Sequence, residues 1–319
     1  MTDVIFSQAE ATERLEKSVV TIGNFDGMHI GHQAIVEEAR RRAREHDARV
    51  VALTFEPHPV AFFRPDEAPV RLSPPPYKFD LIADAGVDTV VALTFDESLA
   101  GQSPEAFVES ILVDSLKACH VVVGEDFRFG KKRAGDTKSL KQLGQPLGMG
   151  CSVVDFITWR GEPVSSTRIR RAIDQGQLEA AQAMLGRPHR LYGEVVHGEQ
   201  RGRKLGFPTA NMEVVQMAQP PAGVYATTLA RDGGVRWRAI TNIGERPTFG
   251  GGERTVETFV LDDRVADDLD LYGEEVDLDL YRRVREERAF DSPKELVAQI
   301  ERDIEWVREF FDEEGMDGR

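Results

Sequence analysis

The first half of the chain alternates between short apolar runs and longer segments whose apolar residues recur at helical spacing. Apolar runs with few polar positions are typical of strands buried on both faces of a parallel sheet; here they occupy residues 19–22, 50–55, 89–95, 121–124 and 151–156. Helical patterns separate them at residues 35–46, 76–85, 104–115 and 137–144. This alternation predicts an α/β fold with a doubly wound parallel sheet.

The pattern changes after Gly186. Short β-like runs separated by Gly and Pro turns follow, and these predict an antiparallel β-barrel. The last segment begins with a Ser292 cap and Pro293 and carries apolar positions at helical spacing, so we expect an amphipathic helix that covers the barrel. The stretch from Gly186 to Arg190 is the expected boundary, which gives domains at residues 1–186 and 187–319.

The composition narrows the class of protein. A chain of 319 residues, 41% of them hydrophobic, is large enough for about two packed domains. It has no apolar run near the roughly 18 residues of a membrane span and no signal-peptide core, so we expect a cytoplasmic protein. Two cysteines exclude a disulfide framework. The net charge of −15 disfavours nucleic acid and anionic membranes as partners. We expect a monomer or a weak homo-oligomer.

The segment GNFDGMHIGH, residues 23–32, carries the strongest candidate chemistry. It leads from a predicted strand into a helix, so His29 and His32 lie where unpaired N–H groups and the helix dipole attract a phosphate. Two imidazoles there suit phosphoryl chemistry, in which preorganised donors stabilise developing negative charge. The segment resembles the HxGH box of nucleotidyltransferases. Either histidine taken alone could equally be an ordinary core or surface residue.

Three further segments follow predicted strands: FEPHP at residues 55–59, GEDFRFG at 124–130 and VSSTRIR at 164–170. Because the carboxyl ends of parallel strands meet at one edge of the sheet, we expect a ligand site at that edge. The seven histidines do not have the spacing of zinc ligands, so no metal site built from protein alone is expected.

These segments, in this order, resemble the bifunctional bacterial riboflavin kinase/FMN adenylyltransferase family, whose members are also called FAD synthetases. The likeness continues through the second half in GRKLGFPTANM, GVYA, NIGERPTF, VETFVLD, LYG and REERAFDSPKELVAQIERDI, and so covers nearly the whole chain. It implies two ATP-dependent reactions: a barrel domain that phosphorylates riboflavin to FMN, and a parallel-sheet domain that adenylylates FMN to FAD and releases pyrophosphate.

For the adenylyl transfer, the resemblance implies that His29 and His32 donate hydrogen bonds to the transferring phosphoryl oxygens. No general base is required, because the attacking phosphate is already ionised. The residues implied to bind ATP and its phosphates are Gly23, Asn24, Phe25, Ser166, Thr167, Arg168 and, as a weaker candidate, Arg170. Those implied to contact the flavin are His58, Phe62, Asp126, Phe127, Arg128 and Phe129. Many relatives carry Asn where Asp126 stands. Read without the HxGH box, SSTRIR is also an ordinary helix start, and any one phenylalanine could be core.

For the kinase reaction, the attacking ribityl hydroxyl must lose a proton, so a carboxylate within hydrogen-bond reach is useful. The resemblance implies that Glu257 is this base, and strand alternation points it away from Val256 and Thr258. It implies that Thr209 ligates Mg²⁺ beside the ATP phosphates and that Asn211 holds the same region. A flap over residues 202–206 would bring Arg203 and Lys204 to the phosphates. An exposed strand glutamate and a plain Pro-Thr turn are the alternatives.

Three functions therefore compete. The first is a bifunctional enzyme whose substrates are riboflavin, FMN and ATP and which uses Mg²⁺. The second is a single-activity FMN adenylyltransferase whose barrel is a flavin-binding regulatory module; PTAN and Glu257 argue against it. The third is a non-enzymatic nucleotide-binding interaction protein, which the HxGH and SSTRIR segments disfavour.

Overall fold

The computed structural model describes residues 2–198, 206–231, 234–246, 253–262 and 271–316. The chain divides into two compact units, Met1–Ser166 and Thr167–Arg319. No helix among the described residues combines the length and apolarity that crossing a membrane requires.

In the described part of the first unit, six parallel strands form one sheet in the order β1-β4-β3-β2-β5-β8. Their bounds are β1 Asp3–Ile5, β2 Ser18–Ile22, β3 Arg49–Glu56, β4 Thr89–Thr94, β5 Ala118–Gly124 and β8 Gly150–Val154. The predicted parallel sheet is confirmed, and the carboxyl ends of its strands meet at one edge. The short edge strand β1 was not predicted.

Both faces of this sheet are covered, because successive residues of each strand belong to two different cores. In β3, Val51 and Leu53 pack with the residues of α1 and α7, whereas Val50 and Ala52 pack with those of α2 and α4. The doubly wound fold is therefore confirmed. The helices of this unit are α1 Gln8–Arg14, α2 Ile30–His46, α3 Pro59–Phe63, α4 Tyr77–Asp84, α5 Glu97–Ala100, α6 Pro104–Ala106 and α7 Thr137–Gly144. Two small hairpins pair β6 Arg128–Phe129 with β7 Gly135–Asp136, and β9 Thr158–Trp159 with β10 Glu162–Pro163.

The segment predicted as one helix at residues 104–115 differs in detail. Only Pro104–Ala106 is α-helical, and Phe107–Ser115 forms a π-helix. The wider turns of a π-helix still bury Phe107, Ile111 and Leu112 in the core that contains α1. Hydrophobic spacing alone does not distinguish this widened helix from an ordinary one.

In the described part of the second unit, six antiparallel strands close into a barrel in the order β11-β12-β15-β14-β13-β16. They are β11 His189–Val196, β12 Ala210–Val214, β13 Gly223–Arg231, β14 Arg236–Arg246, β15 Glu253–Val260 and β16 Glu275–Glu286. Leu191, Leu229, Ile243, Val256 and Leu278 are among the residues that fill its core. The predicted barrel is confirmed.

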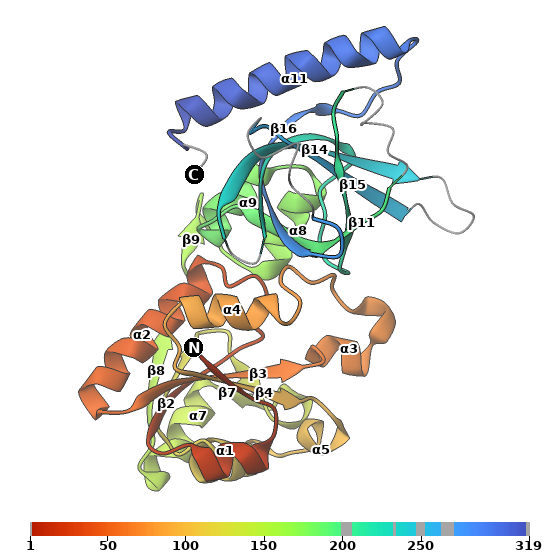
Figure 1. Ribbon diagram of the computed structural model, residues 1–319. Coiled ribbons are helices and arrows are strands. Elements are labelled where there is room, and N and C mark those ends of the chain that lie inside the picture. Colours follow the sequence, from red (N-terminus) through yellow and green to blue (C-terminus); the bar gives the residue numbers. More distant parts are fainter. Residues whose placement is uncertain (1, 199–205, 232–233, 247–252, 263–270, 317–319) are drawn as a thin grey trace. The chain divides into compact units, whose positions relative to one another are not determined.

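Helix α11, Pro293–Glu313, lies along the outside of the barrel (Figure 1). The Ser292 hydroxyl accepts the Glu295 N–H at 3.3 Å and caps its start. Val307 and Phe311 are fully buried and pack against Val224 and Ile240 of the barrel wall. The predicted amphipathic helix is confirmed.

Helices α8 Ser166–Asp174 and α9 Leu178–Leu185 come between the sheet and the barrel in the chain. Leu178 of α9 belongs to the barrel core. The predicted boundary at residue 186 stays a prediction, since the compact units divide at Ser166 and Thr167.

Candidate active sites

The loop between β2 and α2 has an unusual backbone. Phe25 and Met28 have φ of 50° and 37°, which non-glycine residues rarely adopt, and Gly27 between them has φ of 84°. The side chains of Phe25 and Met28 are almost fully buried in the core beneath α2. This burial holds the loop in its strained conformation and turns its backbone toward the carboxyl edge of the sheet.

Asp26 fastens this loop to the segment before α4. Its buried carboxylate accepts the N–H groups of Leu72 and Ser73, both at 2.9 Å, and the Ser73 hydroxyl at 3.3 Å. The same hydroxyl accepts the Gly27 N–H at 2.7 Å. The Ser166 hydroxyl donates to the Asp26 carbonyl at 2.8 Å, so the SSTRIR segment begins at this loop.

The two histidines are stacked at the start of α2. Their ring centroids are 3.6 Å apart with 15° between the planes, and the Phe25 ring meets His32 edge-on at 5.3 Å. His29 is the N-cap: its Nδ1 accepts the His32 N–H at 3.3 Å, so the neutral His29 ring carries its proton on Nε2. Burial, together with the His29 ring, lowers the pKa of His32 well below its ordinary value. His32 is therefore neutral at pH 7, and its Nδ1 has no hydrogen-bond partner among the described residues.

A partly buried ion-pair cluster supports the end of β3. Glu56 binds Arg71 through two hydrogen bonds of 2.8 and 2.6 Å and also pairs with the buried Lys78. Lys78 donates to the Thr54 hydroxyl at 3.2 Å, and that hydroxyl donates to the Asn24 carbonyl at 3.4 Å. Burial lowers the pKa of Lys78, although Glu56 opposes this effect. The cluster thus connects the FEPHP segment to the backbone of the histidine loop.

The predicted flavin residues lie on two segments. On the first, His58 Nε2 and Asn24 Nδ2 are 3.1 Å apart, and the half-exposed Phe62 ring packs edge-on against Phe63 and Phe95. On the second segment Asp126 and Arg128 are exposed, Phe129 is buried in the core, and Phe127 stacks on Phe129 with 5.5 Å between centroids. Solvent therefore reaches Phe127 rather than Phe129.

The remaining predicted phosphate residues of this region lie on α8. Ser166 is its first residue and belongs to the first unit, while Thr167, Arg168 and Arg170 belong to the second. Gly23 directly follows β2, and its N–H donates to the Leu53 carbonyl at 3.1 Å. The phosphate contacts of all these residues stay predictions.

On the barrel, Glu257 occupies the centre of a polar row. It is the register partner of Asn211 on β12 and of Asn242 on β14, so three polar residues lie side by side across three strands. Val256 and Val260 point into the barrel core, so Glu257 points to the outer face together with Phe259, which packs beneath α11. Glu257 is half-buried. Its carboxylate forms no hydrogen bond or ion pair within the described part of the chain.

Hydrogen-bonded threonines stiffen the wall behind this row. Thr241 exchanges hydrogen bonds with Thr227 at 2.8 Å and with Thr258 at 2.9 Å, and all three hydroxyls are buried inside the barrel. Because these bonds connect β13, β14 and β15, they fix the strands that carry Asn242 and Glu257.

The predicted Mg²⁺ residues lie at the start of β12. Thr209 and Asn211 are half-buried, and neither side chain has a partner among the residues the structure describes. Gly198 lies against the Asn211 amide so closely that a Cβ there would collide with it. A hydroxyl and an amide with free oxygens suit Mg²⁺, which prefers oxygen ligands and shares them with phosphates. Arg203 and Lys204 lie outside the described residues.

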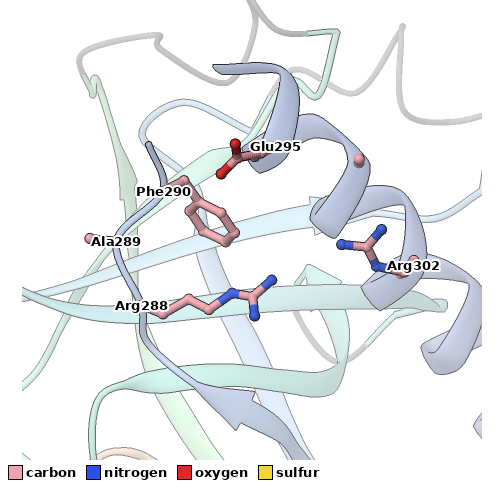
Figure 2. A pocket seen from close by; sticks show the side chains of 6 residues that line it. Arg288, Ala289, Phe290, Glu295 and Arg302 are labelled. Carbon is pink, nitrogen blue, oxygen red and sulfur yellow. The ribbon is translucent and has the colours of Figure 1, made fainter. Parts of the chain in front are cut away.

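A pocket of about 340 Å³ lies between the end of β16 and the start of α11 (Figure 2). Its lining includes the Phe290 ring and the side chains of Arg288 and Arg302. Both arginines donate to the Gln299 amide oxygen, Arg302 at 2.7 Å, and neither has a carboxylate partner among the described residues. Glu295 also lines the pocket, so its walls carry charges of both signs beside the Phe290 ring. An aromatic wall next to guanidinium groups suits a flat ring with polar edges.

The sequence interpretation missed two features of the barrel site. Asn242 lies in the NIGERPTF segment, to which the sequence analysis assigns no role. A polar residue between two residues that the structure buries, Thr241 and Ile243, indicates a side chain on the opposite face of the strand, where it could contact a ligand. Arg288 and Phe290 were quoted within the REERAF segment in the same way, although an arginine and an aromatic next to a predicted helix start could have marked a pocket.

Comparison with known proteins agrees with both halves of the chain. Residues 11–168 match the FAD synthetase family and residues 185–311 match the riboflavin kinase family. A crystal structure described as that of a macrolide-efflux protein from Streptococcus pneumoniae has a TM-score of 0.84 and 29% identity, covering 96% of this chain and 98% of that chain. The fold and the two family matches thus define a nucleotidyltransferase-type parallel sheet joined to a kinase-type barrel.

Proteins with this complete arrangement are also among its relatives. Bifunctional riboflavin kinase/FMN adenylyltransferases from Escherichia coli and Haemophilus influenzae are 38% and 34% identical to it over 296 and 301 residues. Each match covers at least 93% of both chains. The chain belongs to the bifunctional riboflavin kinase/FMN adenylyltransferase family.

Proposed function

We propose that this chain makes FAD in two steps, phosphorylating riboflavin to FMN at the barrel and adenylylating FMN at the parallel sheet. One observation carries the proposal. The chain contains two separate constellations suited to phosphate chemistry: stacked histidines at a helix start, and a polar row centred on the Glu257 carboxylate on a barrel of the kinase family.

In the adenylyl transfer, the start of α2 would attract the phosphates through its unpaired N–H groups. The His29 Nε2–H would donate to a transferring phosphoryl oxygen, which supports the charge that develops there. His32 is kept neutral by burial, so it contributes a hydrogen bond rather than a charge. The backbone from Gly23 to Phe25 would line the ATP channel, while the Phe25 side chain is buried in the core.

In the kinase reaction, the Glu257 carboxylate would accept the proton of the ribityl 5′-hydroxyl as the γ-phosphoryl group is transferred. Thr209 and Asn211 would hold Mg²⁺, which when bound neutralises charge on the ATP phosphates. Arg203 and Lys204 would add charge beside those phosphates. The isoalloxazine ring would lie in the pocket beside Phe290 and Arg288, since Glu287 connects that pocket directly to the polar face.

Product analysis tests this proposal. Purified protein is incubated with ATP and Mg²⁺ and with either riboflavin or FMN, and the flavins are separated by chromatography. We expect FMN and then FAD from riboflavin, FAD from FMN, and no product with EDTA. FAD from FMN but no FMN from riboflavin would favour the regulatory barrel. No product from either flavin would favour a non-enzymatic nucleotide-binding protein.

Three further expectations from the sequence stay predictions, and the proposed function does not depend on them. They are a cytoplasmic location, a monomeric or weakly oligomeric state, and the exclusion of nucleic acid and membranes as partners.

A further inference from the structure

Three consecutive cations occupy the tip of the hairpin between β6 and β7. Lys131, Lys132 and Arg133 are exposed, and none of them forms an ion pair within the described part of the chain. The whole chain has a net charge of −15, of which this tip contributes +3, so the remaining residues carry −18. The tip therefore attracts anions that the rest of the protein repels.

The carboxylate nearest to the tip in the sequence is already engaged elsewhere. Asp136 caps the start of α7, where its carboxylate accepts the Ser139 N–H at 2.8 Å. It is also the register partner of Arg128 on the other strand of the hairpin. The hydrogen bonds from Ser139, together with the Arg128 charge, lower the pKa of Asp136, so this carboxylate is ionised at neutral pH. Its charge is shared with α7 and Arg128, and the three cations of the tip stay uncompensated.

The backbone of the tip is fixed to the body of the first unit. The Lys131 N–H donates to the Gln102 carbonyl at 2.7 Å. Gly130 has φ of 69° and lies so close to Pro104 that a Cβ there would be 2.8 Å from the Pro104 nitrogen. The two residues after Lys131 have φ of 57° and 58°, a conformation that non-glycine residues keep only where the surrounding structure holds it. The positive charge is therefore presented at a defined place.

That place is the edge of the sheet at which the histidine site lies. The hairpin follows the carboxyl end of β5, and a Cβ on Gly124, the last residue of this strand, would lie 3.5 Å from Ile35 of α2. The end of β5 therefore adjoins the first turns of the helix that begins at the two histidines. The hairpin also carries the stacked rings of Phe127 and Phe129, and the Phe129 ring packs directly over Gly135. The cations and the candidate flavin residues thus belong to one small structural unit.

The chemistry of the tip favours one kind of anion. A small positive surface on an acidic protein suits a small anion better than an extended polyanion, because the surrounding negative charge repels the rest of a long chain. Both FMN and ATP are small anions. The predicted ATP residues lie on other segments, the loop before α2 and the start of α8, whereas the tip belongs to the hairpin with the candidate flavin residues. The phosphate of FMN, with a charge of about −1.5 to −2, is the matching ligand.

We propose that Lys131, Lys132 and Arg133 form an electrostatic capture surface that draws FMN to the adenylyl-transfer site. This inference rests on the proposed adenylyl transfer. The surface acts while FMN approaches and does not touch the reacting atoms. Steering of this kind raises association rates by about 10- to 1,000-fold and weakens steeply as salt screens the charges. Uncharged riboflavin gains nothing from it, so the surface favours the phosphorylated flavin at this site.

A salt series on the full chain tests the capture surface. With ATP saturating, kcat/KM for FMN in FAD formation is measured between about 0.01 M and 1 M salt, over which the Debye length falls from about 30 to 3 Å. The same series is run for riboflavin in FMN formation, where the varied substrate is uncharged. We expect kcat/KM for FMN to depend on salt far more strongly than kcat/KM for riboflavin. Each variant is then compared with the natural chain at the same salt concentration.

Two matched charge reversals assign the effect to the tip. Lys132→Glu changes the tip, and Lys117→Glu is its control, because both lysines are exposed and have similar φ, 57° and 52°. Lys117 precedes β5 and so lies at the opposite end of a seven-residue strand, about 20 Å away. At the lowest salt, Lys132→Glu should lower kcat/KM for FMN about threefold and the double variant Lys131→Glu/Lys132→Glu about tenfold, with kcat unchanged. Lys117→Glu and the charge-conserving Lys132→Arg should match the natural chain, and at 1 M salt all these differences should vanish.

The other outcomes would overturn the inference in distinct ways. A loss that persists at 1 M salt, or that lies in kcat, would mean that the tip only supports the fold. A loss confined to kcat/KM for ATP would mean that the tip attracts the nucleotide instead. An equal loss in Lys117→Glu would mean that the total charge matters and the place does not. If the natural chain forms no FAD from FMN at any salt concentration, the proposed adenylyl transfer fails and the capture surface fails with it.

Discussion

Replacing Asp26 by alanine should unfold the first unit more easily than any exposed substitution nearby. The Asp26 carboxylate is the acceptor for the buried Leu72 and Ser73 N–H groups, so alanine leaves two donors without partners. Each unsatisfied buried donor costs about 1–3 kcal/mol, which gives about 2–6 kcal/mol in total. A domain is stable by only about 5–15 kcal/mol. The loop that carries the histidines therefore depends strongly on this one side chain.

Urea unfolding followed by Trp159 fluorescence measures the loss. Trp159 is the only tryptophan of residues 1–166, so the assay is run with Trp237→Phe and Trp306→Phe in every protein. With a slope of about 1–3 kcal/mol per M, Asp26→Ala should lower the midpoint by about 1 M or more. Asp26→Asn keeps an acceptor oxygen and should lose less than half as much. An unchanged midpoint for Asp26→Ala would refute the reasoning.

Three shorter predictions concern the sites. Lys78→Met removes the buried partner of Glu56, so kcat/KM for ATP in FAD formation should fall about tenfold in steady-state assays, while FMN formation should not change. The control Lys138→Met alters an exposed lysine and should leave both reactions unchanged. Thr209→Val should lower the rate of FMN formation about 100-fold, and extra Mg²⁺ should partly restore that rate. An unchanged rate would exclude Thr209 as a Mg²⁺ ligand. Folding lowers the pKa of His32, so the unfolded chain binds a proton on this ring more readily than the folded chain. The free energy of unfolding is therefore highest above about pH 6.5 and falls as the pH drops below that value, by up to about 1.4 kcal/mol per pH unit. His32→Asn should therefore flatten the unfolding free energy measured from pH 7.5 to pH 5, and an equally steep profile would contradict this.

The layers of the fold were predictable because buried strands and amphipathic helices leave strong patterns in the sequence. Strand β1 was not, because Asp3–Ile5 is too short to show a pattern and becomes a strand only by pairing with β4. The continuous apolar runs also do not reveal which residue faces which core. That division, with Val50 on one face and Val51 on the other, emerges only when helices cover the sheet.

The candidate sites were predictable where the chemistry lies in one short segment. His29 and His32 are of this kind, since the strand, turn and helix around them are local. Lys78 is not: on its own helix it resembles a surface residue, and its burial depends on Glu56, which comes 22 residues earlier. The alignment of Asn242 with Glu257 depends on the register between two strands, which neither strand specifies alone.

Two variants in the full chain test most directly whether two independent sites act in series. Glu257→Gln and His29→Ala are incubated with ATP, Mg²⁺ and either flavin, and the products are separated by chromatography. Glu257→Gln should form no FMN from riboflavin but make FAD from supplied FMN, whereas His29→Ala should accumulate FMN and form no FAD. A variant that loses both reactions while folded, or that loses the opposite one, would contradict the account.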